Sequence, residues 1–151
     1  MVILECEGRK MSACTFFGHR DAPSHIRPLL RAAIIDLIEK HAVDHFYVGR
    51  QGAFDAMVQS VFRELRPIYP KVRFYVVLER MPGSETGNID TEWTLLPEGI
   101  ELAPPRFAIV RRNEWMLKSS DYVIAYVCRS FGGAAHFMDL AIKRGKTVIR
   151  L

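Results

Sequence analysis

Short apolar runs alternate with helix-like segments along most of the chain. Five runs have the length and apolar content of buried strands: 13–17, 45–48, 72–78, 122–127 and 147–151. Three segments repeat apolar residues every three or four positions, as a helix with one buried face does: 26–42, 54–65 and 134–144. Strands that are apolar throughout and alternate with helices are typical of a parallel sheet covered on both faces. The pattern therefore predicts an α/β protein, a Rossmann-like three-layer sandwich with a mainly parallel sheet of about five strands and helices on both faces.

The length of 151 residues points to one domain, which we place at residues 11–151. Residues 1–10 do not join the pattern, because the first strand-like run begins only after Met11. The codons of residues 7–10 can form a purine-rich stretch, like a ribosome-binding site, just before that methionine. We therefore expect Met11 to be the native start and residues 1–10 to be an N-terminal extension from a mis-called start.

Residues 79–106 interrupt the alternation with prolines, glycines and acidic residues. In a compact domain, a stretch this long without regular structure is usually functional or disordered. We expect residues 81–105 to form a lid over a bound ligand, with Trp93 packed against the domain. A short helix is predicted next, at 113–119, with Asn113 as its N-terminal cap.

Charge limits the class of partner. The chain has 21 Lys and Arg residues and 17 Asp and Glu residues, so its net charge is +4, and these charges are scattered. This balance suits an anionic ligand but lacks the concentrated basic face of a nucleic-acid binder, so we do not expect a nucleic-acid partner. No apolar stretch approaches the roughly 20 residues of a membrane span, so we expect no membrane partner either.

The cysteines bear on metal binding and on location. Cys6, Cys14 and Cys128 have no metal-ligand spacing, and no other cluster in the sequence has it. We therefore expect no metal site, and we expect no cofactor. Cys14 and Cys128 lie in apolar runs, where a buried free thiol is the expected state. Free thiols fit a reducing compartment, so the predicted location is the cytoplasm.

Glycines and polar residues gather after the predicted strands. In an open parallel sheet, ligands bind beyond the carboxyl ends of the strands. Glycine in a strand-to-helix turn frees backbone N–H groups to face a ligand, and the following helix adds a partial positive charge. The turns at 49–52 and 132–133 are therefore predicted to form one crevice for a phosphate-bearing ligand. The predicted ligand-binding residues are Gly18, His19, Arg20, Gly49, Arg50, Gly52, Asp55, Arg112, Asn113, Ser130, Gly132 and Gly133.

Several of these side chains have a structural alternative. His19 is either a general base or ligand donor, or a turn histidine bonded to backbone. Arg20 either faces the ligand or pairs with Asp21 or Asp55. Asp55 either binds a ribose hydroxyl or stabilises the first turn of its own helix. Ser130 either donates to phosphate or caps its turn.

Four stretches carry a resemblance to a known family: CTFFGHRD, YVGRQGAFDAMV, AIVRRNEWMLKSSDYVIAYV and GGAAHFMDLAIKRGKTVIRL. In this order they resemble the SLOG superfamily, close to its YpsA-like bacterial members, over residues 11–151. The resemblance implies a Rossmann-like domain that binds nucleotides or nucleotide-derived ligands in a pocket lined by the glycine-rich turns. It also implies a homo-oligomer. Many members of the superfamily have no assigned reaction.

Two branches of that superfamily supply the alternatives. The LOG-type phosphoribohydrolases cleave the base from nucleoside monophosphates and carry P-G-G-x-G-T-x-x-E. Residues 131–139 depart from that motif at the Pro, the third Gly, the Thr and the Glu, which is Asp139 here. An N-glycosidic-bond hydrolase therefore stays an alternative, with His19, Glu79 or Asp139 as candidate acid or base. The second branch, the DNA-processing proteins, makes weak single-strand binding a further alternative, although this chain lacks a basic groove.

The function that we expect first is a sensor or carrier module. It would bind a nucleotide-like small molecule at the carboxyl edge of the sheet. Whether it also catalyses a reaction is left open, because no complete catalytic motif is present in the sequence.

Overall fold

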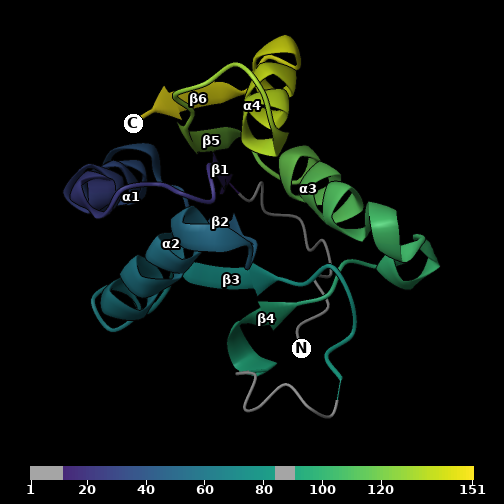
Figure 1. Cartoon of the computed structure of the whole chain (residues 1–151). Coiled ribbons are helices and arrows are strands. Elements are labelled where there is room, and N and C mark those ends of the chain that lie inside the picture. The colour runs from purple at the N-terminus through teal and green to yellow at the C-terminus, as the bar shows by residue number, and fades with distance from the viewer. Residues whose placement is uncertain (1–11, 84–90) are drawn as a thin grey trace.

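The computed structural model describes residues 12–83 and 91–151. They form an α/β fold in which one parallel sheet lies between two pairs of helices (Figure 1). The sheet has six strands in the order β4-β3-β2-β1-β5-β6, and every pairing is parallel. The strands are β1 (Ala13–Gly18), β2 (His45–Val48), β3 (Arg73–Val77), β4 (Thr94–Leu95), β5 (Tyr122–Tyr126) and β6 (Thr147–Arg150).

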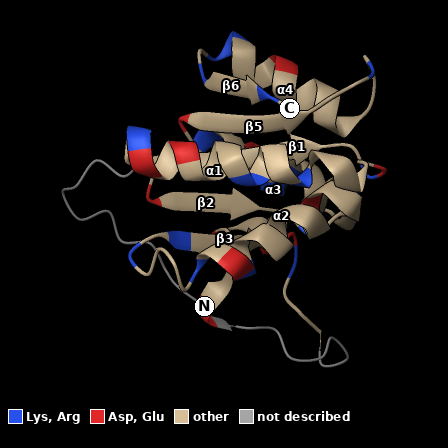
Figure 2. Cartoon of the chain, turned by 90° about the vertical axis from the view of Figure 1, so that its left-hand side faces the viewer, with Lys and Arg blue, Asp and Glu red and all other residues tan. Residues whose placement is uncertain are grey.

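Helices cover both faces, as predicted. α1 (Arg27–His41) and α2 (Gly52–Leu65) lie on one face, and Figure 2 shows them in front of the strands. α3 (Ala108–Lys118) and α4 (Gly133–Lys143) lie on the other (Figure 1). Four short 3₁₀ helices join these elements: η1 (Ser24–Ile26), η2 (Thr91–Trp93), η3 (Ile100–Leu102) and η4 (Pro105–Phe107).

Two apolar layers hold the sheet between the helix pairs. Successive side chains of a strand point to opposite faces, so β1 contributes to both layers. Cys14 and Phe16 pack with the apolar side chains of α1 and α2. Phe17 packs with those of α3 and α4, and its ring stacks on Phe137 at 5.1 Å between centroids. The buried central strand thus fixes the position of the loop that follows it.

The order of the strands places a crevice next to β1. The chain leaves β1 for α1 on one face, whereas it leaves the neighbouring strand β5 for α4 on the other. The two connections diverge, which opens a space beyond the carboxyl ends of these strands. Such a switch point is where open parallel sheets bind their ligands.

The structure adds one strand and corrects one helix. The sixth strand, β4, lies in the irregular segment and pairs with β3 through Val76–Thr94 and Val77–Leu95. The prediction that a helix begins at Asn113 was wrong, because α3 begins at Ala108 and Asn113 lies inside it, where it caps nothing. The turn that Pro105 opens runs directly into α3, and the polar run at 111–114 had hidden the helical period.

The exposure of one cysteine also differs from the prediction. Cys14 is buried in β1, and burial raises the pKa of its thiol. Cys128 is exposed, because β5 ends at Tyr126 and the cysteine lies in the loop beyond it. The predictions about residues 1–10 and Met11 concern positions outside the described residues.

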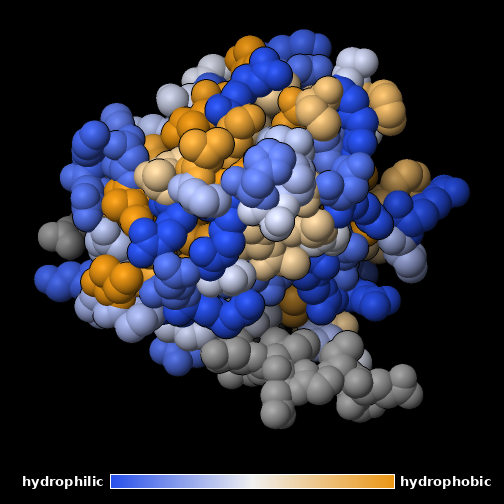
Figure 3. Space-filling view, turned by 60° about the vertical axis from the view of Figure 1, so that its left-hand side comes forward, coloured by the Kyte–Doolittle hydropathy of each residue, from blue (hydrophilic) through white to orange (hydrophobic). Residues whose placement is uncertain are grey.

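The surface agrees with scattered charge. Figure 2 shows Lys and Arg interspersed with Asp and Glu over the face of α1 and α2. On this face, β5 and β6 have no helix in front of them in the described part of the chain (Figure 2). Figure 3 shows hydrophobic side chains gathered in the upper part of the molecule, at the height of these two strands. No helix within residues 12–83 and 91–151 is long and apolar enough to cross a membrane.

Candidate functional site

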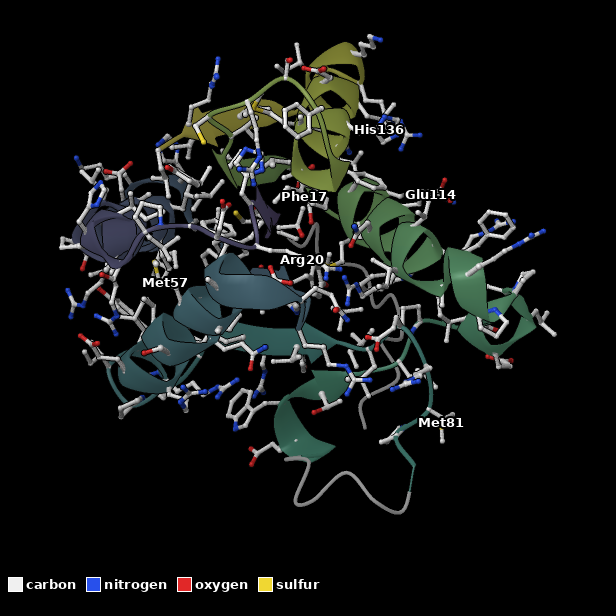
Figure 4. All side chains as sticks on the ribbon, in the orientation of Figure 1. Phe17, Arg20, Met57, Met81, Glu114 and His136 are labelled. Carbon is white, nitrogen blue, oxygen red and sulfur yellow. The ribbon has the colours of Figure 1, made fainter. Side chains whose placement is uncertain are left out.

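A cavity of about 370 Å³ opens at the carboxyl edge of the sheet, at the switch point. Its volume falls within the roughly 300–1,000 Å³ of typical small-molecule pockets. Its walls come from the end of β1, the start of α2, one side of α3 and the loop from β5 into α4. Figure 4 shows Phe17 and Arg20 at this edge, between α2 and the pair α3 and α4. The lining residues are Phe16, Phe17, Gly18, His19, Arg20, Gln51, Asp55, Ile109, Arg112, Asn113, Met116, Arg129, Phe131, Gly132, Gly133 and Ala134.

Most of the predicted ligand-binding residues lie on these walls. The structure brings together eight of them: Gly18, His19, Arg20, Asp55, Arg112, Asn113, Gly132 and Gly133. It leaves four outside the lining: Gly49, Arg50, Gly52 and Ser130. The catalytic candidates Glu79 and Asp139 do not line the cavity either, and Asp139 is exposed on α4. No described residue of 81–105 lines it, so a lid role for that segment stays a prediction.

The turn into α4 presents open backbone. Gly132 has φ 95° and ψ 173°, a conformation that favours glycine, and α4 starts at the next residue without a side-chain cap. A Cβ atom built on Gly132 or Gly133 would meet nothing within 4 Å. The first turn of α4 also contains no acidic residue. This helix N-terminus is therefore free to stabilise an anion in the cavity.

The glycines at 49–52 serve packing instead. A Cβ on Gly49 would lie 2.7 Å from Cζ of Arg112 and 2.9 Å from Oδ2 of Asp55. Gly52 has φ 81°, and a Cβ there would lie 2.7 Å from Cα of Arg20. The N–H of Ala53 donates to the carbonyl oxygen of Arg20 at 2.8 Å. The start of α2 is thus closed by the loop after β1, and the cavity is built on one open turn rather than two.

A buried ion-pair network lies behind the cavity. Arg50 donates from Nε and Nη2 to both carboxylate oxygens of Glu79, at 2.8–3.1 Å. Arg112 is 2% exposed and donates from Nη1 to Oε2 of Glu79 at 3.3 Å. Burial alone would raise the pKa of Glu79, but the hydrogen bond from Arg50 and the charge of Arg112 hold that pKa below its ordinary value. Glu79 is therefore an ionised partner of two arginines, which is a structural role.

Asp55 is the one carboxylate among the lining residues that the structure describes. It is 8% exposed, and its Oδ2 accepts the N–H of Gln51 at 2.8 Å. Burial raises the pKa of Asp55 to about 6, although the Gln51 hydrogen bond and the charges of Arg112 and Arg20 lower it in part. The side chain closes the first turn of α2 and also faces the cavity. The structure is therefore compatible with both predicted roles of Asp55, binding of a ribose hydroxyl and stabilisation of its own helix.

The raised pKa of Asp55 predicts a pH dependence of stability. The pKa of the Asp55 carboxyl is about 6 in the folded protein and 3.8, its ordinary value, in the unfolded chain. Because the folded protein binds the proton more tightly, protonation of Asp55 stabilises the fold. This stabilisation is fully present below pH 3.8 and is lost as the pH rises through 6. Relative to Asp55→Asn, the wild-type free energy of unfolding should therefore gain about 1 kcal/mol between pH 7 and pH 5. Urea unfolding of both proteins at the two pH values measures this gain. A difference that does not change with pH would contradict it.

His19 is bonded to backbone. Its Nε2 accepts the N–H of Cys128 at 3.0 Å, which places the ring proton on Nδ1. Burial, with the charge of Arg129, lowers the pKa of His19. The neutral ring ties the loop after β1 to the loop after β5, so the structural alternative for His19 is the one observed.

Arg20 lies at the cavity, where its charge acts on Asp55 across the space without forming an ion pair. The predicted alternative partner Asp21 is held by Arg129, which donates from both Nη atoms at 2.7 and 3.1 Å. Arg20 is exposed and has no ion-pair partner within residues 12–83 and 91–151. Its donor groups are therefore available to a ligand, whereas the guanidinium of Arg112 is hydrogen-bonded to Glu79.

Sequence reasoning missed part of the lining. Arg129 and Phe131 follow β5, and Phe131 is 70% exposed beside the glycine turn. Phe131 could have been found, because it is an apolar residue between Ser130 and the two glycines of a predicted ligand-binding turn. On α3, the lining residues Ile109, Arg112, Asn113 and Met116 are spaced by 3, 1 and 3, which is the period of one helix face.

Among the described residues, no group of three His, Cys, Asp or Glu side chains is placed to hold a metal ion.

Comparisons with known proteins leave the family open. A scan against protein-family models finds no family that matches the chain. A search of the curated proteins finds no match either. The resemblance to the SLOG superfamily therefore stays a prediction.

Proposed function

We propose that the protein binds a nucleotide or nucleotide-derived ligand through its phosphate, as a sensor or carrier module. The observation that carries this proposal is the uncapped N-terminus of α4 at the cavity, with open space over Gly132 and Gly133. Backbone N–H groups and the helix dipole there favour an anion. Arg20, which lines the same cavity without a carboxylate partner in the described residues, adds a full positive charge.

The remaining walls suit the rest of a nucleotide. Phe17, Ile109, Met116 and Phe131 give the cavity apolar surface, against which a planar base can pack. Polar side chains lie between them, among them Asn113 and Gln51. The sequence resemblance to the SLOG superfamily points to the same class of ligand. From that resemblance we also expect a homo-oligomer, and from the free thiols a cytoplasmic location.

Binding is favoured over catalysis because the three catalytic candidates are engaged or displaced. Nε2 of His19 is occupied by a backbone N–H, and Glu79 is paired with two arginines. Asp139 is exposed and lies outside the lining. Glu79 and Asp139 are therefore not placed to exchange a proton with a ligand in the cavity, and His19, which lines the cavity, has its acceptor nitrogen occupied.

Calorimetric titration with the four ribonucleoside monophosphates tests the proposal, with inorganic phosphate as the minimal ligand. Saturable binding, with the nucleotide recovered intact after incubation, is the expected result. Release of the free base would instead support the nucleotide hydrolase. No binding of any of these ligands at millimolar concentration would contradict the proposal.

Removal of the Arg20 guanidinium gives a sharper prediction. Arg20→Ala should weaken binding of a nucleoside monophosphate roughly fivefold, the equivalent of about 1 kcal/mol for an exposed charge contact. Arg63→Ala makes the same change of charge at an exposed position of α2 outside the cavity, and should leave the affinity unchanged. Calorimetry on both variants measures the effect. Equal affinities for the two variants would show that Arg20 does not contact the ligand.

A further inference from the structure

The Asp55 carboxylate is only half satisfied. Oδ2 accepts the N–H of Gln51, whereas Oδ1 has no hydrogen-bond partner within residues 12–83 and 91–151. Asp55 is buried, yet Oδ1 is not among the fully enclosed polar atoms that lack a partner. Because Asp55 lines the cavity, the free oxygen opens onto the space where a ligand would lie.

The surroundings hold this carboxylate in place. The missing side chain of Gly49 leaves room for Oδ2 of Asp55 and for the guanidinium of Arg112, both within 3 Å of the same point. Arg112 is itself fixed by Glu79 and by Asn113. An acceptor that is fixed in place and opens onto the cavity can bond a ligand donor without rearrangement of the protein, so the half-satisfied carboxylate favours a ligand that donates to it.

We propose that Oδ1 of Asp55 accepts hydrogen bonds from the ribose hydroxyls of the ligand, so that the site selects ribonucleotides over 2′-deoxyribonucleotides. This inference rests on the proposed function. A carboxylate accepts hydrogen bonds and repels anions, so the group that meets Asp55 must be a donor without negative charge; in a nucleotide these donors are the ribose hydroxyls and the amino groups of the base. The phosphate then lies at the other polar feature, the open turn at 132–133, and the two together orient the ligand.

An amino group of the base is the other possible donor. It shares the chemistry of a neutral donor, and ligands without a base separate the two sources. Ribose 5-phosphate keeps the hydroxyls and lacks the base. 2-Deoxyribose 5-phosphate lacks the 2′-hydroxyl as well.

The contact should depend on pH. The charged and polar groups that face Asp55 are Arg112 from α3, Arg20 from the loop after β1 and the Gln51 amide at the start of α2. Protonation of the carboxyl, with its pKa of about 6, removes the charge that accepts the hydroxyl bonds. The preference for ribose should therefore be strong above pH 6 and weaken below it. A ratio of two affinities isolates this effect, because the phosphate ionises equally in both ligands.

The test is the ratio of the affinities for adenosine 5′-monophosphate and its 2′-deoxy counterpart, measured by calorimetry at pH 7.5. We expect wild type to prefer the ribonucleotide roughly tenfold, as for a hydrogen bond to a charged group. Asp55→Asn, which keeps the size of the side chain but accepts only an uncharged and weaker hydrogen bond, should lower this ratio severalfold. Asp36→Asn, the same change on α1 outside the cavity, should keep the wild-type ratio. The wild-type ratio at pH 5 should also be lower, which tests Asp55 even if its variant does not fold.

Three outcomes overturn parts of the account separately. If phosphate and nucleotides fail to bind to wild type, the proposed function fails. If they bind without a preference for ribose, or if Asp55→Asn keeps the full preference, only the role of Asp55 fails. If Asp55→Asn weakens both nucleotides equally and leaves ribose 5-phosphate unchanged, the carboxylate binds the base, and the assignment to the sugar is wrong.

Discussion

Arg112→Ala is expected to lower the free energy of unfolding by about 3 kcal/mol, because it breaks a buried hydrogen-bonded ion-pair network and removes a fully buried side chain. The guanidinium is 2% exposed, donates to Glu79 and lies beside Asp55, whose Oδ2 approaches the same point next to Gly49. Its removal leaves both carboxylates with one less positive neighbour and opens a void in the wall of the cavity. Urea unfolding followed by circular dichroism measures the loss.

The neighbouring residue supplies a matched control for this prediction. Arg111 precedes Arg112 on α3, carries the same charge and is exposed. Arg111→Ala should change the free energy of unfolding by less than about 0.5 kcal/mol, as most surface substitutions do. If the two variants were equally stable, the buried network would not contribute as described.

Gly18→Ala is expected to destabilise the fold by about 2–3 kcal/mol, in the upper range for overpacking of a core. A Cβ at this position would overlap the ring of Phe54, which is fully buried at the start of α2. Because the ring is fully buried, either the ring or α2 must shift away from the end of β1. The prediction therefore concerns the junction that places the loop after β1 against α2.

Gly133→Ala serves as the comparison, because a Cβ there meets nothing within 4 Å and the glycine does not need a positive φ. This variant should unfold at nearly the wild-type urea concentration. Thermal and urea unfolding of both variants give the answer. A Gly18→Ala protein as stable as Gly133→Ala would show that the end of β1 and α2 are packed less closely than described.

Strands and most helices could be predicted because burial governs them locally. β2, for example, is a run of four residues of which three are buried, and α2 has a regular apolar stripe. β4 could not be predicted, since two residues carry no pattern and its identity depends on pairing with β3. The start of α3 was missed because Arg111, Arg112 and Asn113 interrupt its apolar period, although Arg112 is buried.

The location of the site could be predicted from the sequence, but the contacts between its residues could not. Parallel strands bring their carboxyl ends to one edge, so the residues after β1, β2 and β5 had to meet there. Which glycine turn is open depends on distant side chains. Arg112 fills the space at Gly49, and nothing fills the space at Gly132. In the same way, His19 is bonded to Cys128, 109 positions away, and no local pattern contains that contact.

The central claim is that a phosphate-bearing ligand binds at the open turn into α4. The most direct test is a titration of ¹⁵N-labelled protein with adenosine 5′-monophosphate, followed through the backbone amide resonances. We predict that the largest shifts are those of Gly132, Gly133 and Ala134, with the loop after β1 next, and that they saturate. Saturable shifts confined to other parts of the molecule, or no shifts at millimolar nucleotide, would contradict the claim.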